Sequence, residues 1–485
     1  MKEMTLRDKA GVMLAIFALT VCYQLFLATS LTPIGLNEGN DSLVFKHIGL
    51  ALLQGKVPYI DLFDHKGPIV YFIDALGIGL TSGRWGLYLV YCLYIAMTTY
   101  IWWLMASLFV RPRQTVWPVA VALSAYLIVN VEGNLTEEWS LLPISYGLYV
   151  FVRHFVTGEP ITTKRFFLVG IAMGVVTFLR INNMAAVCCA ILFYIVYHLY
   201  QRDKVTIPML FRSCLTILSG WALVFAVCCL AIFALYGSEG LEEMLYGTFT
   251  FNFEYMGFSP IVSTDRKKVY LYFGLTTFVI LLLLFMKKRL SALNILIALC
   301  YAGSFIALGT KGWSNYFIIL APVTLVAAAA LSDVTNRWQK ALVFLMFFAI
   351  LPYRTYLSWA NIHEDKTFYE ETDDIIRGMT QEEHGRIWND AYFDGLTVLH
   401  RNGLIQANRV MLPFQLQISE RLARDEAARF EAVAPLWIMT SMPFEEWTPM
   451  PLDSVRTARD YTLYKKVERS PGRYVYFYRL NRKEQ

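Results

Sequence analysis

The chain has 485 residues, of which 56% are hydrophobic and only 17% are charged, and its formal net charge at pH 7 is +5. With a mean hydropathy of +0.44, this composition indicates a polytopic membrane protein rather than a soluble one. The small positive charge calls for no nucleic-acid partner, because basic residues beside membrane spans act as orientation signals.

A spanning helix needs about 20 apolar residues, and by that measure the sequence predicts about 11 transmembrane helices. Their approximate cores are residues 11–31, 84–110, 116–130, 139–153, 166–181, 184–200, 213–236, 269–286, 290–308, 315–332 and 339–354. Asn182 and Asn183 separate the predicted spans 166–181 and 184–200, and they form either a bend or a true loop. Basic residues precede the first span and recur at alternate boundaries, which predicts a cytoplasmic amino terminus and an extracytoplasmic C-terminal segment. A bacterial plasma membrane suits the chain best.

Polar residues gather in the loop that follows the first span. Apolar and polar side chains alternate over residues 41–54 as in a short helix that lies in the membrane interface. Asp41 begins this predicted helix, where it serves either as an N-cap or as a functional acid. Asp64, His65 and Lys66 follow, and Pro68 is well placed as the first residue of the next helix.

Two later boundaries on the predicted external face carry further polar groups. Glu137 and Glu138 lie at the outer end of the fourth span, where they orient an acceptor, hold a cation or cap the helix. Arg180 and Lys311 are cations predicted near the same face. Tyr316 follows Lys311 in a polar, aromatic turn, and such aromatic residues also form interfacial belts.

The composition changes abruptly after residue 354. Residues 355–485 hold 37 charged residues in 131, against 44 in the preceding 354. We therefore predict a membrane domain over 1–354 and a small extracytoplasmic soluble α/β domain over 355–485. Within the latter, the patterns favour strands and helices; the predicted strands are 435–439 and 473–480, and the predicted helices are 368–378 and 417–432.

The first loop resembles that of the GT-C superfamily of membrane glycosyltransferases, particularly the bacterial branch akin to the protein O-mannosyltransferases and the aminoarabinose transferase of lipid A. In that branch an acid follows the first span, a juxtamembrane helix comes next, and an acid-Lys-Pro motif opens the following helix. Asp41 and Asp64-His65-Lys66-Gly67-Pro68 follow this order. The chain departs from the pattern in having Asn40-Asp41-Ser42 rather than a paired Asp-Glu, and Asp64-His65-Lys66 rather than Glu-Lys-Pro-Pro.

The resemblance implies a GT-C-like membrane domain with juxtamembrane helices. It also implies transfer of a sugar from a polyprenyl-phosphate donor to a glycan, lipid or protein acceptor on the extracytoplasmic face, with inversion at the anomeric carbon. An acceptor hydroxyl is a weak nucleophile, and a nearby carboxylate can take its proton, so we assign Asp41 as the general base. The departing lipid phosphate needs fixed cations, and the candidates are Lys66, Arg180 and Lys311. The predicted substrate or acceptor contacts are Asp64, His65, Glu137, Glu138 and Tyr316.

Two other classes of function stay open. A secondary transporter or flippase of lipid-linked or small polar substrates would show inverted repeats and ionisable residues near the membrane midplane, whereas the charges here lie at span ends. A glycan polymerase or ligase would use the same carrier but need a large external loop, and the longest such connection, residues 237–268, is modest.

Metal and disulfide chemistry have little support in the sequence. The cysteines all fall in apolar spans, where they are expected to be buried packing residues rather than disulfide partners. The histidines show no metal-ligand spacing. No cofactor is firmly predicted, and a divalent cation stays open.

Overall fold

The chain folds into two compact units. The computed structural model describes residues 6–81, 83–111, 114–129, 132–201, 207–257, 291–307, 314–332, 366–444 and 460–481, with the single positions 274, 277, 338 and 341. The first unit comprises Met1–Pro33, Tyr88–Leu230 and Pro260–Trp359. The second comprises Ile34–Leu87, Ala231–Ser259 and Ala360–Gln485.

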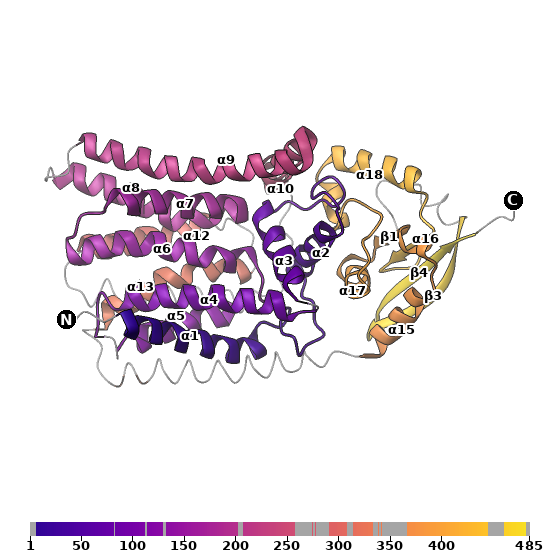
Figure 1. Cartoon of the computed structure of the whole chain (residues 1–485), viewed down its shortest axis with the longest axis horizontal. Coiled ribbons are helices and arrows are strands. Elements are labelled where there is room, and N and C mark those ends of the chain that lie inside the picture. The colour runs from indigo at the N-terminus through magenta and orange to yellow at the C-terminus, as the bar shows by residue number, and fades with distance from the viewer. Residues whose placement is uncertain are drawn as a thin grey trace. The chain divides into compact units, whose positions relative to one another are not determined.

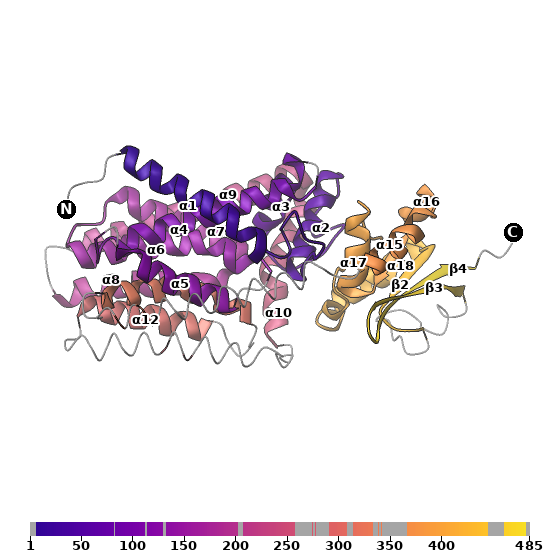
Figure 2. The same ribbon diagram turned by 90° about the horizontal axis from the view of Figure 1, so that it is seen from below.

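The first unit is a bundle of apolar helices, which lie side by side in Figures 1 and 2. Its helices are α1 (Leu6–Leu27), α4 (Trp85–Ala106), α5 (Val116–Val129), α6 (Thr136–Thr157), α7 (Thr163–Arg180), α8 (Ala185–Gln201), the first part of α9 (Ile207–Leu245), α12 (Ala292–Ala307) and α13 (Ala321–Leu331). Two 3₁₀ segments, Ile181–Met184 and Ser314–Leu320, join them. Each helix of this bundle matches a predicted span. The predicted spans 269–286 and 339–354 fall almost wholly outside the described residues.

The chain is a multi-pass membrane protein, as predicted. Among the described residues, four helical stretches are long and apolar enough to cross a membrane, namely Ala10–Leu27, Trp85–Ala106, Thr163–Gln201 and Ile207–Tyr255. Shorter apolar helices accompany them, at Pro68–Leu80, Val116–Leu127, Ala292–Ala307 and Asn315–Leu331. The count of about 11 spans stays a prediction.

The chain reverses its direction at Asn182 and Asn183, between α7 and α8. The rings of Phe151 and Tyr194 are 5.7 Å apart, and one turn further along both helices those of His154 and His198 are 5.2 Å apart, so α6 and α8 run in the same direction. Because α7 packs beside α6 after a short loop and therefore runs against it, the chain must turn again before α8.

Small residues let α7 and α9 approach closely. A Cβ atom at Gly170 would lie 2.0 Å from the carbonyl oxygen of Ile217, and one at Gly220 would lie 2.2 Å from that of Phe167. A Cβ at Gly174, one turn after Gly170, would lie 2.6 Å from the Val224 side chain of α9. Glycines spaced in this manner allow the backbones of membrane helices to touch.

The second unit joins the first loop to the C-terminal residues. Its helices are α2 (Asp41–Leu53), α3 (Pro68–Leu80), α10 (Phe251–Gly257), α15 (Lys366–Arg377), α16 (Gln381–His384), α17 (Tyr392–Arg401) and α18 (Glu420–Val433). A sheet of order β1-β2-β4-β3 contains β1 (Ile387–Asp390), β2 (Trp437–Thr440), β3 (Tyr461–Ser470) and β4 (Arg473–Leu480). Among the strands that the structure describes, β1 and β2 are parallel, whereas β2 and β4, and β4 and β3, are antiparallel.

The predicted small α/β fold of the C-terminal residues is confirmed. The strands expected at 435–439 and 473–480 correspond to β2 and β4, and the helices expected at 368–378 and 417–432 correspond to α15 and α18. The core of the sheet is apolar, with Ile387, Met439, Val475 and Phe477 fully buried. The proposed domain boundary near residue 354 lies outside the described residues and stays a prediction.

The described part of the external connection expected over 237–268 is helical, and the external position of this connection stays a prediction. Helix α9 continues to Leu245 past a break at Gly237, whose φ is 72° and ψ is −167°. A π-helical segment, Tyr246–Thr250, and α10 then follow directly. Glycine adopts this backbone conformation without a Cβ clash, so the chain changes direction and stays helical.

Candidate functional site

Helices α2 and α3 pack side by side and run in the same direction. The rings of Phe45 and Tyr71 are 6.2 Å apart, and one turn further along both helices a Cβ at Gly49 would lie 2.8 Å from the backbone nitrogen of Ala75. The sequence offset between the partners is the same at both contacts, so the helices are parallel. The first turn of α2, which holds Asp41, therefore lies at the same end of the pair as the residues just before α3.

Asp41 is the first helical residue of α2 and not its N-cap. Asn40 takes the cap position, with φ −99° and ψ −77°, and its side chain makes no capping hydrogen bond. The interpretation of Asp41 as an N-cap is therefore wrong. Its half-buried carboxylate lies in the first turn, where the helix dipole favours a negative charge.

Lys66 lies close to the face of α2 that carries Asp41. Its Nζ is 5.9 Å from the centroid of the Phe45 ring. Phe45 follows Asp41 by one helical turn and so shares its face. The predicted base and one predicted phosphate ligand thus belong to the same end of the α2–α3 pair.

Asp64, His65 and Lys66 form a chain of polar contacts. The Oδ1 atom of Asp64 is 3.2 Å from Nδ1 of His65, and Nε2 of that ring is 2.9 Å from Nζ of Lys66. The Tyr71 hydroxyl donates to the other carboxylate oxygen of Asp64 at 3.0 Å. Burial alone would raise the pKa of Asp64, but the neighbouring Lys66 and His65 outweigh it and hold that pKa far below its usual range.

Two residues far away in the sequence support this motif. The Gln415 amide nitrogen is 3.3 Å from Oδ1 of Asp64 and 3.3 Å from Nδ1 of His65. The Asn252 amide donates to the backbone carbonyl of His65 at 2.9 Å. Sequence reasoning missed both residues, because nothing in the local pattern links them to the loop.

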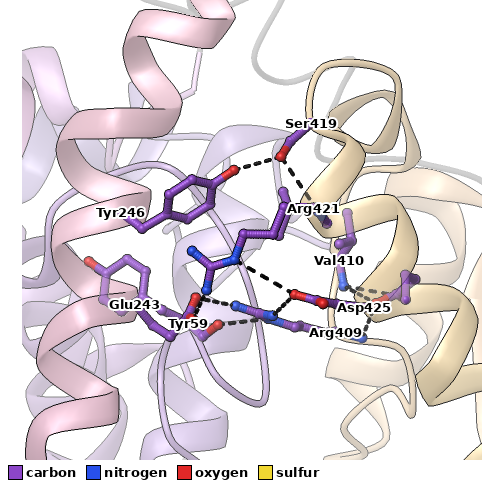
Figure 3. Close-up of polar contacts among 10 residues, drawn as sticks. Tyr59, Glu243, Tyr246, Arg409, Val410, Ser419, Arg421 and Asp425 are labelled. Atoms are coloured by element: carbon purple, nitrogen blue, oxygen red, sulfur yellow. Dashed lines mark hydrogen bonds and ion pairs between the residues drawn. The ribbon is translucent and has the colours of Figure 1, made fainter.

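The loop before the motif is anchored by an arginine of the C-terminal residues (Figure 3). Tyr59 has a positive φ of 68°, a conformation that a bulky residue keeps only when its surroundings enforce it. Arg409 Nε donates to the Tyr59 carbonyl at 2.8 Å, and Arg409 Nη2 donates to Glu243 at 2.6 Å. Phe63 in turn donates its N–H to the Arg409 carbonyl at 2.7 Å. Arg421 also pairs with Glu243.

A second buried network fixes the entry to α2. Glu38 forms ion pairs with Lys46 and with Arg84. The Arg84 guanidinium also donates to the carbonyls of Gly35, at 2.7 Å, and of Leu36, at 3.1 Å. Burial would raise the pKa of Glu38, but Lys46 and Arg84 together lower it to about 2. The segment just before Asp41 is thus held by charge as well as by backbone contacts.

The remaining predicted site residues with a described position lie in the first unit. Arg180 forms an ion pair with Glu137, which is 1% exposed, and its guanidinium carbon lies 3.6 Å from the centroid of the Tyr316 ring. Glu138 accepts the backbone N–H of Leu135 at 2.9 Å, and its other oxygen accepts from buried tyrosine hydroxyls. The capping alternative therefore holds for Glu138.

The predicted site residues thus form two clusters. One contains Asp41, Asp64, His65 and Lys66 in the second unit, and the other contains Glu137, Arg180 and Tyr316 in the first, where Glu138 caps the same helix as Glu137. Lys311 lies outside the described residues.

Within the described ranges, no three His, Cys, Asp or Glu side chains are grouped as a metal site would require. All eight cysteines are free, although only Cys92 and Cys300 are fully buried. The expectation that every cysteine is buried is therefore wrong.

The fold is similar to that of several solved structures. ArnT from Cupriavidus metallidurans in the apo state matches with a TM-score of 0.61 and 13% sequence identity, over 96% of this chain and 97% of that one. ArnT bound to undecaprenyl phosphate matches with a TM-score of 0.56 and 12% identity, over 98% of both chains. The archaeal oligosaccharyltransferase AglB from Archaeoglobus fulgidus, in complex with an inhibitory peptide and a dolichol-phosphate, matches with a TM-score of 0.50 and 14% identity, over 96% of this chain and 74% of that one. No protein-family model and no curated protein sequence matches.

Proposed function

We propose that this chain, which has the fold of the GT-C membrane glycosyltransferases, transfers a sugar from a polyprenyl-phosphate donor to a glycan, lipid or protein acceptor. The observation that best supports this function is the position of Asp41 and Lys66 at one end of the parallel α2–α3 pair. Undecaprenyl phosphate and dolichol-phosphate, the lipids bound in the ArnT and AglB structures, are both polyprenyl phosphates. That shared ligand chemistry supports a donor of the same class.

In the proposed reaction Asp41 is the general base. It takes the proton of the acceptor hydroxyl while the oxygen attacks the anomeric carbon on the side opposite the phosphate. The bond between that carbon and the phosphate oxygen breaks, and the configuration inverts. Positioned proton transfer of this kind contributes typically ~10²–10⁴-fold to a rate.

Lys66 is the proposed partner of the departing phosphate, because a fixed cation stabilises charge that develops in the transition state. Arg180 is a weaker candidate, since its charge is already balanced by the buried Glu137. Lys311 stays a proposal without a described position. Contacts of the acceptor with Asp64, His65, Glu137, Glu138 or Tyr316, and use of a divalent cation, also stay proposals.

The proposed orientation puts the amino terminus in the cytoplasm of a bacterium. The second unit, which holds Asp41 and the C-terminal sheet, then faces the extracytoplasmic side of the plasma membrane. The distribution of Lys and Arg between alternate loops supports this orientation.

The test is transfer by purified Asp41→Asn protein. An amide keeps the shape of the side chain but cannot take the proton, so we expect kcat to fall by about 10²–10⁴-fold with normal folding. Asp61→Asn is the matched control, because Asp61 lies in the same unit and an amide oxygen can still accept its hydrogen bond from Val57. Full turnover by Asp41→Asn would refute the base assignment. Movement of a lipid-linked sugar across the proteoliposome membrane, without transfer of the sugar to an acceptor, would favour the transporter alternative.

A further inference from the structure

The donors and acceptors of the Asp64–His65–Lys66 chain have a single consistent direction. An ammonium group has only hydrogens to offer, so Nε2 of His65 accepts from Lys66. The proton of the neutral ring then lies on Nδ1, which faces Oδ1 of Asp64 at 3.2 Å. Asp64 accepts at both oxygens, and the Gln415 amide nitrogen therefore donates to Asp64 rather than to the ring.

The His65 ring has little freedom to turn. Its centroid lies 5.0 Å from that of Tyr255 and 5.7 Å from that of Phe251. The backbone that follows the ring is also held, because Asn252 donates to the His65 carbonyl and the Tyr59 hydroxyl donates to the Lys66 carbonyl at 2.8 Å. A ring fixed in this way presents Nε2 at one place.

Burial differs sharply along the chain of contacts. Asp64 is 2% exposed, His65 is 8% exposed and Gln415 is fully buried, whereas Lys66 is only half-buried. Lys66 is therefore the member best able to reach a ligand in this structure, and the others can act on a ligand through it.

From these contacts, and resting on the proposed function, we infer that Asp64 and His65 are positioning residues that hold the Lys66 ammonium for the donor phosphate. We call this chain of contacts the Asp64–His65–Lys66 relay, in the sense that each side chain positions the next. Gln415, contributed by the C-terminal residues, completes the relay by holding Asp64. Lysine has a long side chain with many rotamers. A relay that selects one arrangement before the lipid arrives reduces the ordering that binding would otherwise require.

The test measures binding of undecaprenyl phosphate to the purified full-length protein in detergent. His65→Leu removes the acceptor for Lys66 and should raise Kd about tenfold, the size expected for one charge-assisted hydrogen bond. His65→Gln offers an amide oxygen to Lys66 and should stay within about threefold of the wild type. Gln415→Leu should weaken binding in the same direction. Gln417→Leu, an exposed position in the same 3₁₀ segment, should have no effect.

A double-variant cycle separates positioning from general damage. If His65 acts through Lys66, then His65→Leu should weaken binding in the wild type and have no further effect in a Lys66→Ala background. Equal losses in both backgrounds, an unchanged Kd in His65→Leu, failure of His65→Gln to restore binding, or no binding by the wild type would each overturn the relay. A wild-type protein that shows the expected coupling and yet transfers no sugar would refute the proposed function alone.

Discussion

Glu38→Gln should loosen the start of α2, because Glu38 neutralises the buried Lys46 and the half-buried Arg84. The pKa of Glu38 falls from 4.5 to about 2 in the folded protein, and each unit corresponds to about 1.4 kcal/mol, which gives a stabilisation of about 3 kcal/mol. Removing one partner of a buried ion pair typically costs about 3–5 kcal/mol. The two figures meet near 3 kcal/mol, which corresponds to an increase in local opening of roughly 150-fold.

Hydrogen exchange of the α2 amides measures this opening directly. Exchange should accelerate over residues 41–53 in Glu38→Gln, and Glu38→Gln/Lys46→Met should recover part of the loss because the fully buried cation, Lys46, is no longer left without its carboxylate. The matched control is Glu159→Gln, which breaks the ion pair of Glu159 with Arg153, in which the Glu159 side chain is 52% exposed. An exposed pair contributes about 0–1 kcal/mol, so this variant should leave α2 unchanged.

The same network predicts a pH dependence of known sign. Because the folded pKa of Glu38 lies below its unfolded value, the stabilisation is present above about pH 4.5 and is lost as the pH falls toward 2. Wild-type protection of α2 should therefore decrease across that window, and protection in Glu38→Gln should not follow it. Equal exchange of α2 in the two proteins at pH 7 would refute the assignment of Glu38 as the charge that holds this segment.

Two further predictions concern the bundle and its orientation. Gly170→Ala should lower the free energy of unfolding of the purified protein by about 1–3 kcal/mol through overpacking. Gly11→Ala should leave it unchanged, because a Cβ at Gly11 meets nothing within 4 Å. Equal stability of the two variants would contradict the close α7–α9 contact. In an otherwise cysteine-free protein, cysteines at the exposed Lys56 and Glu468 should react with an impermeant thiol reagent in outer-membrane-permeabilised cells, and a cysteine at Glu159 should react only after lysis. The reverse labelling pattern would overturn the proposed orientation.

The features that the sequence predicted correctly depend on local signals. Helix α2 occupies the range expected from its amphipathic pattern, and α3 begins at Pro68, as expected for a residue that lacks a backbone N–H. The strands β2 and β4 were predictable because they are short runs of aromatic and β-branched residues. The close contact of α7 was also within reach, since Gly170 and Gly174 form a G-x-x-x-G pattern.

The parts that sequence reasoning missed depend on contacts between distant residues. Arg409 reaches the Tyr59 carbonyl and Gln415 reaches Asp64, and no periodicity or spacing relates residues so far apart. The N-cap interpretation of Asp41 failed for a different reason. Asn and Asp are almost equally good caps, so the sequence could not decide which of Asn40 and Asp41 takes the cap position.

Composition and packing divide this chain differently because they report different properties. Charge density separates residues that face water from residues that face lipid, and it changes near residue 354. Packing instead joins residues 34–87 to residues 360–485, since the first loop and the C-terminal residues form one compact unit. Tyr59 keeps its positive φ within contacts that Arg409 supplies. The C-terminal residues are thus part of the structure that shapes the Asp64–Lys66 segment, and their removal would disturb the proposed donor site rather than only uncover it.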